Sequence, residues 1–142
     1  METNNLTAIT VVTTVKASME KAWKCFTEPA HITQWYNASP DWHAPYAEND
    51  LTVNGKFKTT MAAKDGSFSF DLEGIYTGVE QNKLIEYKLG EERKVKITFA
   101  EQQNEIIVSE TFTPEDVNPI EMQRGGWQAI LDNFKKYTES LK

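Results

Sequence analysis

Few residues of this 142-residue chain are of types that carry chemistry, and they are widely spaced. The two histidines, His31 and His43, and the single cysteine, Cys25, lack the close spacing of a zinc site. Cys25 needs a neighbouring base to act as a nucleophile, so a partly buried thiol is the simpler interpretation. The sequence also has no GxSxG elbow, phosphate-binding glycine loop or dinucleotide fingerprint. We therefore predict no catalytic residue, no metal and no cofactor.

One acidic residue falls at an unusual position. In the segment IIVSETF, strict alternation puts Glu110 on the same side as Val108 and Phe112, which should face a core. A carboxylate there must be paired, protonated, hydrated inside a cavity, or turned outward by a bulge. The structural interpretation is a bulge or a neighbouring Lys or Arg at the sheet edge. The functional interpretation is a group that orients a ligand, assisted by Tyr76, Tyr87 or Arg124.

The composition limits the class of protein. A net charge of −6 and a pI near 5.0 argue against binding to a nucleic-acid backbone, which requires clustered Lys and Arg. No apolar run approaches the length of a membrane-spanning helix, so membrane insertion is not expected. The first residues do not have the pattern of a signal peptide, and one cysteine allows no internal disulfide framework. We expect a single cytoplasmic domain over residues 1–142.

The elements that must position Glu110 begin with a strand and two helices. Residues 6–15 are rich in β-branched side chains and predict the strand. Ser18 can cap a short helix, and Pro29 can begin a second one. Residues 37–50 contain the Pro, Asn and Asp typical of turns, so we expect an ordered loop with at most a short edge strand. The expected inward anchors of the two helices are Ala22, Trp23, Phe26, Ile32 and Trp35.

The middle of the chain alternates with a period of two, which predicts antiparallel strands. Residues 53–63 and 68–79 form the expected hairpin around Asp65 and Gly66, and further strands are expected at 83–89, 94–99 and 105–112. Turns should fall at 90–92 and 101–104. Asn118 as N-cap and Pro119 as first residue then predict a long helix. Its apolar face carries Trp127, Ile130, Leu131, Phe134 and Leu141.

This order of elements suggests a container, because a curved sheet has a concave face that one long helix can cover. Val53 and Ala63 are expected on the apolar face of their strand, and Gly74 and Gly78 face inward where the sheet bends. Gly125 and Gly126 would let the helix bend or approach the sheet closely. The predicted ligand-binding residues are Trp35, Trp42, Phe57, Met61, Phe68, Phe70, Tyr76, Tyr87, Glu110, Trp127, Ile130 and Phe134. The aromatics Trp35, Tyr36, Trp42 and Tyr46 bracket the loop at the expected cavity mouth, where they either close the core or form a gate.

Six stretches together resemble a known family. They are SMEKAWKCFTEPAHITQWY, NDLTVNGKF, DLEGIYTGV, LIEYKL, RKVKITF and NPIEMQRGGWQAILDNFKKYTESL. In order, they are similar to blocks of the bacterial proteins related to the C-terminal domain of the activator of the heat-shock protein 90 ATPase. The resemblance implies an α+β helix-grip fold of the START-like and birch-pollen-allergen-like superfamily. In that fold a curved antiparallel sheet wraps around a long C-terminal helix, with two short helices after the first strand and a hydrophobic cavity.

Three functions are compatible with this resemblance, because the fold alone does not fix an activity. The first is binding of a small hydrophobic or amphipathic, lipid-like molecule between the sheet and the C-terminal helix. The second is a protein-interaction module related to stress-response chaperone activators, with a chaperone as partner. The third is a cyclase- or hydrolase-like enzyme that uses Glu110 or a tyrosine of the same cavity as acid or base. The sequence does not predict an oligomeric state.

Overall fold

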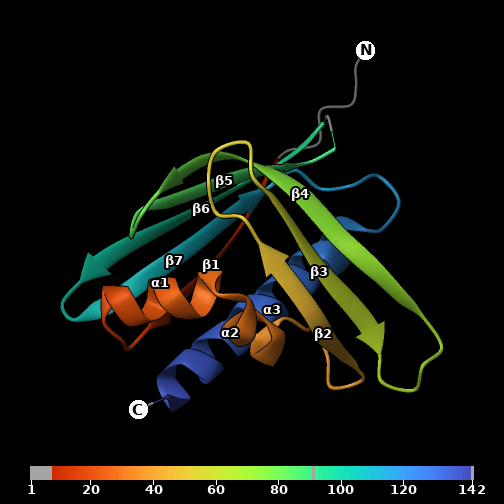
Figure 1. The fold of residues 1–142 in the computed structure, drawn as a ribbon, viewed down its shortest axis with the longest axis horizontal. Helices are drawn as coiled ribbons and strands as arrows, with labels where there is room; N and C mark the ends of the chain where they lie inside the picture. The colour runs from red at the N-terminus through yellow and green to blue at the C-terminus, as the bar shows by residue number, and fades with distance from the viewer. Residues whose placement is uncertain (1–7, 91, 142) are drawn as a thin grey trace.

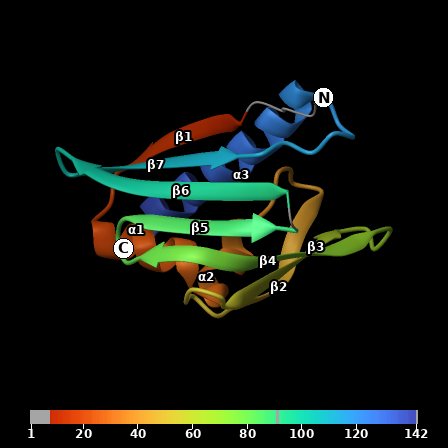
Figure 2. The same cartoon turned by 90° about the horizontal axis from the view of Figure 1, so that it is seen from above.

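The computed structural model describes residues 8–90 and 92–141, and its centre is one antiparallel sheet curved around a long helix (Figure 1). The sheet order is β1-β7-β6-β5-β4-β3-β2, so β1 and β2 form its edges (Figure 2). This confirms the predicted α+β helix-grip architecture. The elements are β1 Ile9–Val15, α1 Met19–Thr27, α2 Pro29–Trp35, β2 Trp42–Asn49, β3 Lys56–Ala63, β4 Ser69–Glu80, β5 Leu84–Leu89, β6 Arg93–Gln102, β7 Glu105–Phe112 and α3 Ile120–Ser140.

The two short helices connect the two edges of the sheet. The Ser18 hydroxyl oxygen accepts the backbone N–H of Lys21 at 3.1 Å, which is the predicted N-cap of α1. Pro29 is the first residue of α2, where its missing N–H costs no helical hydrogen bond. From α2 the chain continues into β2, and α2 packs against that strand and against α3. The short helices therefore close one end of the curved sheet.

The strand β2 is longer than the short edge strand allowed in the loop predicted over residues 37–50. It is an eight-residue strand paired with β3, with an irregular register between His43 and Tyr46. Pro45 lies in that irregular stretch, where a residue without an N–H donor is tolerated at a sheet edge. Because the turn-forming residue types are concentrated here, the local sequence gives little sign of a strand.

Two other boundaries differ from the prediction. β6 runs to Gln102 rather than 99, because Gln103 and Asn104 have positive φ angles of 50° and 68° and make the turn alone. Val53 lies outside β3 and is 54% exposed, in a turn that precedes the strand. Of the other predicted features, residues 6 and 7 and Glu91 of the turn at 90–92 lie outside the described residues.

The start of α3 also differs from the predicted Asn118 cap. Pro119 is the N-cap residue, and the Asn118 side chain instead donates a hydrogen bond to the Glu115 carboxylate at 2.8 Å. That carboxylate also accepts the backbone N–H of Asn118 at 2.6 Å. The buried Gln123 side chain then reaches back and donates to the carbonyls of Glu115 and Asn118. A compact turn in front of the helix thus replaces a side-chain cap.

The apolar face of α3 is confirmed as a core face. Leu131 and Phe134 are fully buried, and Trp127 is stacked on Phe112 of β7 with ring centroids 4.0 Å apart. Phe134 makes edge-to-face contacts with Phe26 of α1 at 5.0 Å and with Trp35 of α2 at 5.1 Å. The helix is therefore joined to the sheet and to both short helices by aromatic contacts.

The inward glycines do not all act as predicted. A side chain on Gly74 would meet the Phe57 ring at 2.5 Å, so this glycine permits a close approach. Gly78 instead faces outward opposite Glu86, because a register shift between Tyr76 and Gly78 reverses the alternation. A side chain on Gly125 or Gly126 would meet no atom within 4 Å. The predicted close approach of α3 at these two glycines is therefore wrong.

We predict opposite effects of alanine at these glycines. Gly125→Ala or Gly126→Ala should each raise the free energy of unfolding by about 1 kcal/mol, because alanine is the better helix former and the space is open. Gly74→Ala should lower it by about 1–3 kcal/mol, because the new methyl group collides with the Phe57 ring. Urea unfolding of the three variants measures both effects. Destabilisation by alanine at both helix positions would contradict the open space around them.

Candidate functional site

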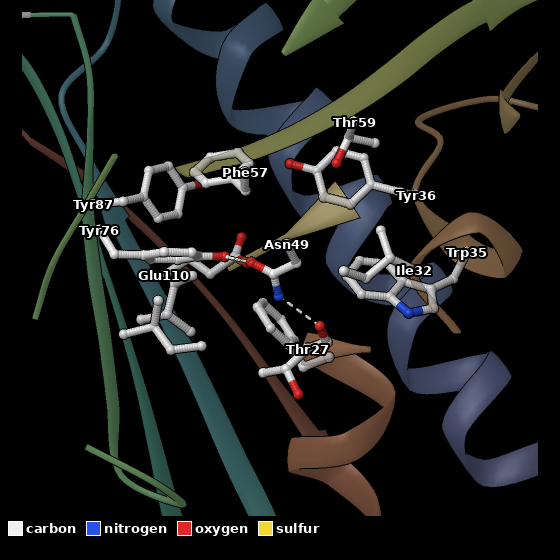
Figure 3. A pocket seen from close by; sticks show the side chains of 13 residues that line it. Thr27, Ile32, Trp35, Tyr36, Asn49, Phe57, Thr59, Tyr76, Tyr87 and Glu110 are labelled. Carbon is white, nitrogen blue, oxygen red and sulfur yellow. Dashed lines mark hydrogen bonds between the residues drawn. The ribbon is translucent and has the colours of Figure 1, made fainter. Parts of the chain in front are cut away.

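A cavity of about 50 Å³ lies between the concave face of the sheet and the two short helices (Figure 3). Most of its wall is aromatic or aliphatic, and its polar groups are few. It is lined by Phe26, Thr27, Ile32, Trp35, Tyr36, Asn49, Phe57, Thr59, Tyr76, Ile85, Tyr87, Ile97 and Glu110. No residue of α3 is among them, so the wall is formed by α1, the α2 region and the sheet.

An aromatic cluster forms the sheet side of the cavity. The ring of Phe57 on β3 lies 4.8 Å from that of Tyr87 on β5 and 5.3 Å from that of Tyr76 on β4. The rings of Tyr76 and Tyr87 are perpendicular at 6.1 Å. Gly74 on β4 has no side chain, and the space this leaves is filled by the Phe57 ring. The glycine therefore determines where this ring lies in the wall.

Asn49 joins three elements at one side of the cavity. The Tyr76 hydroxyl donates a hydrogen bond to Asn49 Oδ1 at 2.5 Å, and Asn49 Nδ2 donates to the carbonyl of Thr27 at 2.6 Å. These bonds connect β4, the end of β2 and the end of α1 (Figure 3). Asn49 is also paired with Phe57 in the β2–β3 register, which turns its side chain inward.

Glu110 is buried within a regular stretch of β7. Its register partners are Val11 on β1 and Ile97 on β6, and neither pairing is interrupted by a bulge. The residue is 7% exposed, and among the described residues none forms an ion pair or hydrogen bond with its carboxyl group. Arg124, a predicted helper, instead pairs with Glu121 at 3.3 Å on the surface. The interpretation of Glu110 as a paired or outward-turned residue is therefore wrong.

Burial controls the protonation of Glu110. Desolvation raises the pKa of its carboxyl group to about 8, so the group is mainly protonated at neutral pH. In the protonated form it offers one O–H donor as well as an acceptor oxygen. A carboxyl group that titrates near neutral pH can also exchange a proton with a bound molecule.

Two tyrosine hydroxyls share this environment. Burial, and secondarily the charge of Glu110, raise the pKa of Tyr36, and burial followed by the neighbouring Tyr36 and Glu110 raises that of Tyr87. Both hydroxyls are neutral at physiological pH. Figure 3 shows the two rings entering the cavity from opposite sides and pointing toward one another. Unlike Tyr76, neither has a hydrogen-bond partner among the described residues.

The structure brings some of the predicted ligand-binding residues together and separates others. Trp35, Phe57, Tyr76, Tyr87 and Glu110 line the cavity. Whether they contact a ligand stays a prediction. Eight other residues line the cavity and were not predicted from the sequence to do so. Three of them are isoleucines, of which Ile32 lies on the short helix α2 and the other two lie on strands. The eight are Phe26, Thr27, Ile32, Tyr36, Asn49, Thr59, Ile85 and Ile97.

The predicted residues of α3 do not line the cavity. Phe134 lies behind Phe26 and Trp35, whose rings separate it from the open space, and Trp127 is occupied by its stack on Phe112. Ile130 packs at the border of the same core. The expected position of the cavity, between the sheet and the C-terminal helix, is corrected to the space between the sheet and the short helices.

The remaining predicted residues lie at the far end of the β3–β4 hairpin. Trp42, Phe68 and Phe70 contact one another with ring centroids 6.0–6.1 Å apart, and Met61 is paired with Phe70. Phe68 is 59% exposed and Phe70 is 43% exposed. Alternation alone could not show that the strands extend beyond the cover of α3 (Figure 1). We call Trp42, Phe68 and Phe70 the outer aromatic cluster.

Cys25 and His31 have structural environments. Cys25 is buried, and desolvation raises the pKa of its thiol, as expected of an inert cysteine. His31 Nδ1 shares a hydrogen bond of 2.6 Å with the Tyr137 hydroxyl on α3. Within residues 8–90 and 92–141, no group of three or more His, Cys, Asp or Glu side chains could hold a metal ion. In the same part of the chain, no helix is both long and apolar enough to cross a membrane.

Comparison with known proteins agrees with this geometry. The family described as activator of Hsp90 ATPase homolog 1-like protein matches residues 16–139. A protein of known structure from Cytophaga hutchinsonii is 56% identical, with 92% of this chain and 91% of that chain covered and a TM-score of 0.80. The AHSA1-like protein from Aeromonas hydrophila is 37% identical, with 94% and 93% covered and a TM-score of 0.89. Among curated proteins, none gives a significant match.

We predict that Glu110 makes stability depend on pH in an unusual direction. Its pKa is about 8 in the folded state and about 4.5 when unfolded, so folding favours the protonated form. The resulting stabilisation is fully present below pH 4.5 and is lost as the pH rises to about 8. Relative to wild type, Glu110→Gln should therefore gain roughly 2–5 kcal/mol of unfolding free energy between pH 5 and pH 9.

Urea unfolding of both proteins between pH 5 and pH 9 measures this gain. Taking the difference between them cancels the titration of all other groups. Glu101→Gln, an exposed change on the neighbouring strand β6, is the matched control and should follow wild type. A constant difference between wild type and Glu110→Gln at all pH values would show that burial does not raise the pKa of Glu110.

Proposed function

The chain belongs to the family of activator of Hsp90 ATPase homolog 1-like proteins, and we propose that it binds a small amphipathic molecule in the cavity around Glu110. The helix-grip fold of this family usually forms ligand-binding domains. The observation that carries the proposal is the composition of the cavity. It combines an apolar wall with a carboxyl group and two tyrosine hydroxyls that have no partner among the described residues.

The size of the cavity limits the ligand. A space of about 50 Å³ exceeds the roughly 10–15 Å³ needed for one water molecule and is well below the roughly 300–1,000 Å³ of pockets for drug-sized ligands. At this size it suits a small molecule rather than a complete lipid. A larger ligand requires the walls to separate.

The hydrogen bonds of Asn49 suggest where such a separation would occur. They tie β2 to α1 and β4 across the cavity, and β2 is an edge strand that also packs against α2. Breaking two hydrogen bonds at an edge requires little rearrangement of the core. In this proposal the end of β2 moves away from α1 and β4 to admit the ligand.

Cyclopentanone, a small ring with one polar atom, is a suitable first probe of the proposed site. We expect it to shift the NMR methyl signals of Ile32, Ile85 and Ile97, which line the cavity, and not that of the exposed Val12. Thr59→Leu places a larger side chain in the cavity and should weaken binding at least about tenfold by loss of space.

The control for this variant is Thr60→Leu, the same change on the opposite face of β3, which should bind as wild type does. Native mass spectrometry of the protein purified under mild conditions should additionally reveal a retained small molecule. Absence of methyl shifts at the three isoleucines, together with absence of retained mass, would overturn the proposed binding function.

A second candidate function is interaction with a protein, which the outer aromatic cluster favours. Three mutually packed aromatic rings at an exposed hairpin end are uncommon on a surface that does not bind another molecule. Aromatic side chains also contribute most of the binding energy at many interfaces. Following the family name, we propose a chaperone of the heat-shock protein 90 class as the partner to test.

Substitution of the exposed members of the cluster tests this second candidate. If the cluster binds the chaperone, the double variant Phe68→Ala, Phe70→Ala should weaken the affinity more than about tenfold in isothermal titration calorimetry. Val12→Ala, at another exposed apolar position on β1, should have no effect. Failure of the wild-type protein to bind the chaperone, or equal binding by the double variant, would exclude this role.

A further inference from the structure

The unpartnered polar groups of the cavity define the chemistry of its ligand more closely, if the proposed binding function holds. Glu110 on β7, Tyr87 on β5 and Tyr36 after α2 reach the cavity from three elements. None of them has a hydrogen-bond partner among the described residues. These three groups border an open space, so a molecule that enters it can supply the hydrogen-bond partners that the protein does not.

Among the described residues, the cavity wall contains no positively charged side chain that could compensate the charge of an anion. No Lys or Arg lines it, and Tyr76 on β4 is the remaining titratable group of its wall. Outside the wall, Asp50 adds to the effect of burial in raising the pKa of Tyr76, and Arg93 is the weakest influence on the pKa of Tyr87. An anionic ligand would therefore find no counter-charge, and each buried unpaired charge costs several kcal/mol.

The hydroxyl hydrogens of the three groups favour a ligand that accepts hydrogen bonds over a ligand that donates them. Each group carries an O–H when it is neutral, and burial favours the neutral form of all three. An ammonium ligand brings only donors, so it would leave the tyrosine hydrogens unpaired and would require Glu110 to ionise away from water. A neutral oxygen can accept hydrogen bonds from two of these groups without moving any charge into the cavity.

We propose that the cavity selects an uncharged molecule that presents a carbonyl-type oxygen to Glu110 and to the hydroxyl of Tyr36 or Tyr87, with its apolar part against Phe57 and the isoleucines. A carboxylic acid kept neutral by apolar surroundings is a strong donor toward such an oxygen. Binding then requires protonated Glu110, so the affinity falls as Glu110 ionises.

Three probes of matched shape test this selectivity on the whole protein. Cyclopentanone carries the carbonyl oxygen, cyclopentylammonium carries a positive charge, and cyclopentane carries neither. Their affinities follow from the NMR methyl shifts of Ile32, Ile85 and Ile97 at pH 6 and pH 9. We expect cyclopentanone to bind most tightly, and about tenfold more weakly at pH 9 than at pH 6, because one donor is replaced by a buried charge.

Variants assign the effect to the three groups. Glu110→Gln should abolish the pH dependence, since an amide stays neutral and keeps an N–H donor, whereas Glu101→Gln should retain it. Tyr36→Phe or Tyr87→Phe, whichever removes the second donor, should weaken cyclopentanone binding roughly three- to tenfold, and no effect of either would exclude a tyrosine donor. Tyr46→Phe, at an exposed tyrosine outside the cavity, should not.

Each other outcome overturns a specific part of the proposal. Tighter binding of cyclopentylammonium, increasing with pH, would identify the site as a cation site. Equal binding of cyclopentane would exclude recognition of an oxygen while leaving the proposed binding function intact. Cyclopentanone binding that does not depend on pH would exclude Glu110 as a donor. No methyl shift with any probe would overturn both this inference and the proposed function.

Discussion

The ring contacts of Phe26 hold the helices against the sheet and place the cavity between them. Its ring meets Phe99 of β6 at 5.3 Å, Phe134 of α3 at 5.0 Å and Trp35 of α2 at 5.4 Å. One side chain of a short helix therefore connects the sheet, the long helix and the second short helix. Because Phe26 also lines the cavity, this junction is the partition between a packed core beneath α3 and an open space beneath α1 and α2.

That partition explains why the position of the cavity could not be predicted from the sequence. Periodicity and capping residues identified the three helices, the strands other than β2 and the apolar face of α3, since each depends on side chains close together in the chain. It also placed Glu110 inward on its strand. The separation of α3 from the cavity depends on how three distant aromatic residues pack, which no local pattern records. Asn49 and Tyr36 were missed for the related reason that β2 and its connection contain residue types common in turns.

The buried carboxyl group of Glu110 lowers the stability of the fold at neutral and basic pH, and it gives the cavity a group that can donate a proton. A protein with a packed apolar residue at Glu110 would avoid the desolvation of a carboxylate at neutral and basic pH. Polar groups that lower stability are commonly found where a protein binds or reacts with another molecule. The regular backbone of β7 around Glu110 supports this interpretation, because no bulge is used to turn the side chain toward water.

The hydrogen bonds of Asn49 have a directional consequence for the cavity. The amide nitrogen must donate to the Thr27 carbonyl, which leaves the amide oxygen to accept from Tyr76. The Tyr76 proton is thereby committed away from the open space, and only its lone pairs remain available there. The wall thus offers donors at Tyr36, Tyr87 and protonated Glu110, and an accepting position at Tyr76. A molecule that carries both an acceptor and a donor can therefore use both kinds of group.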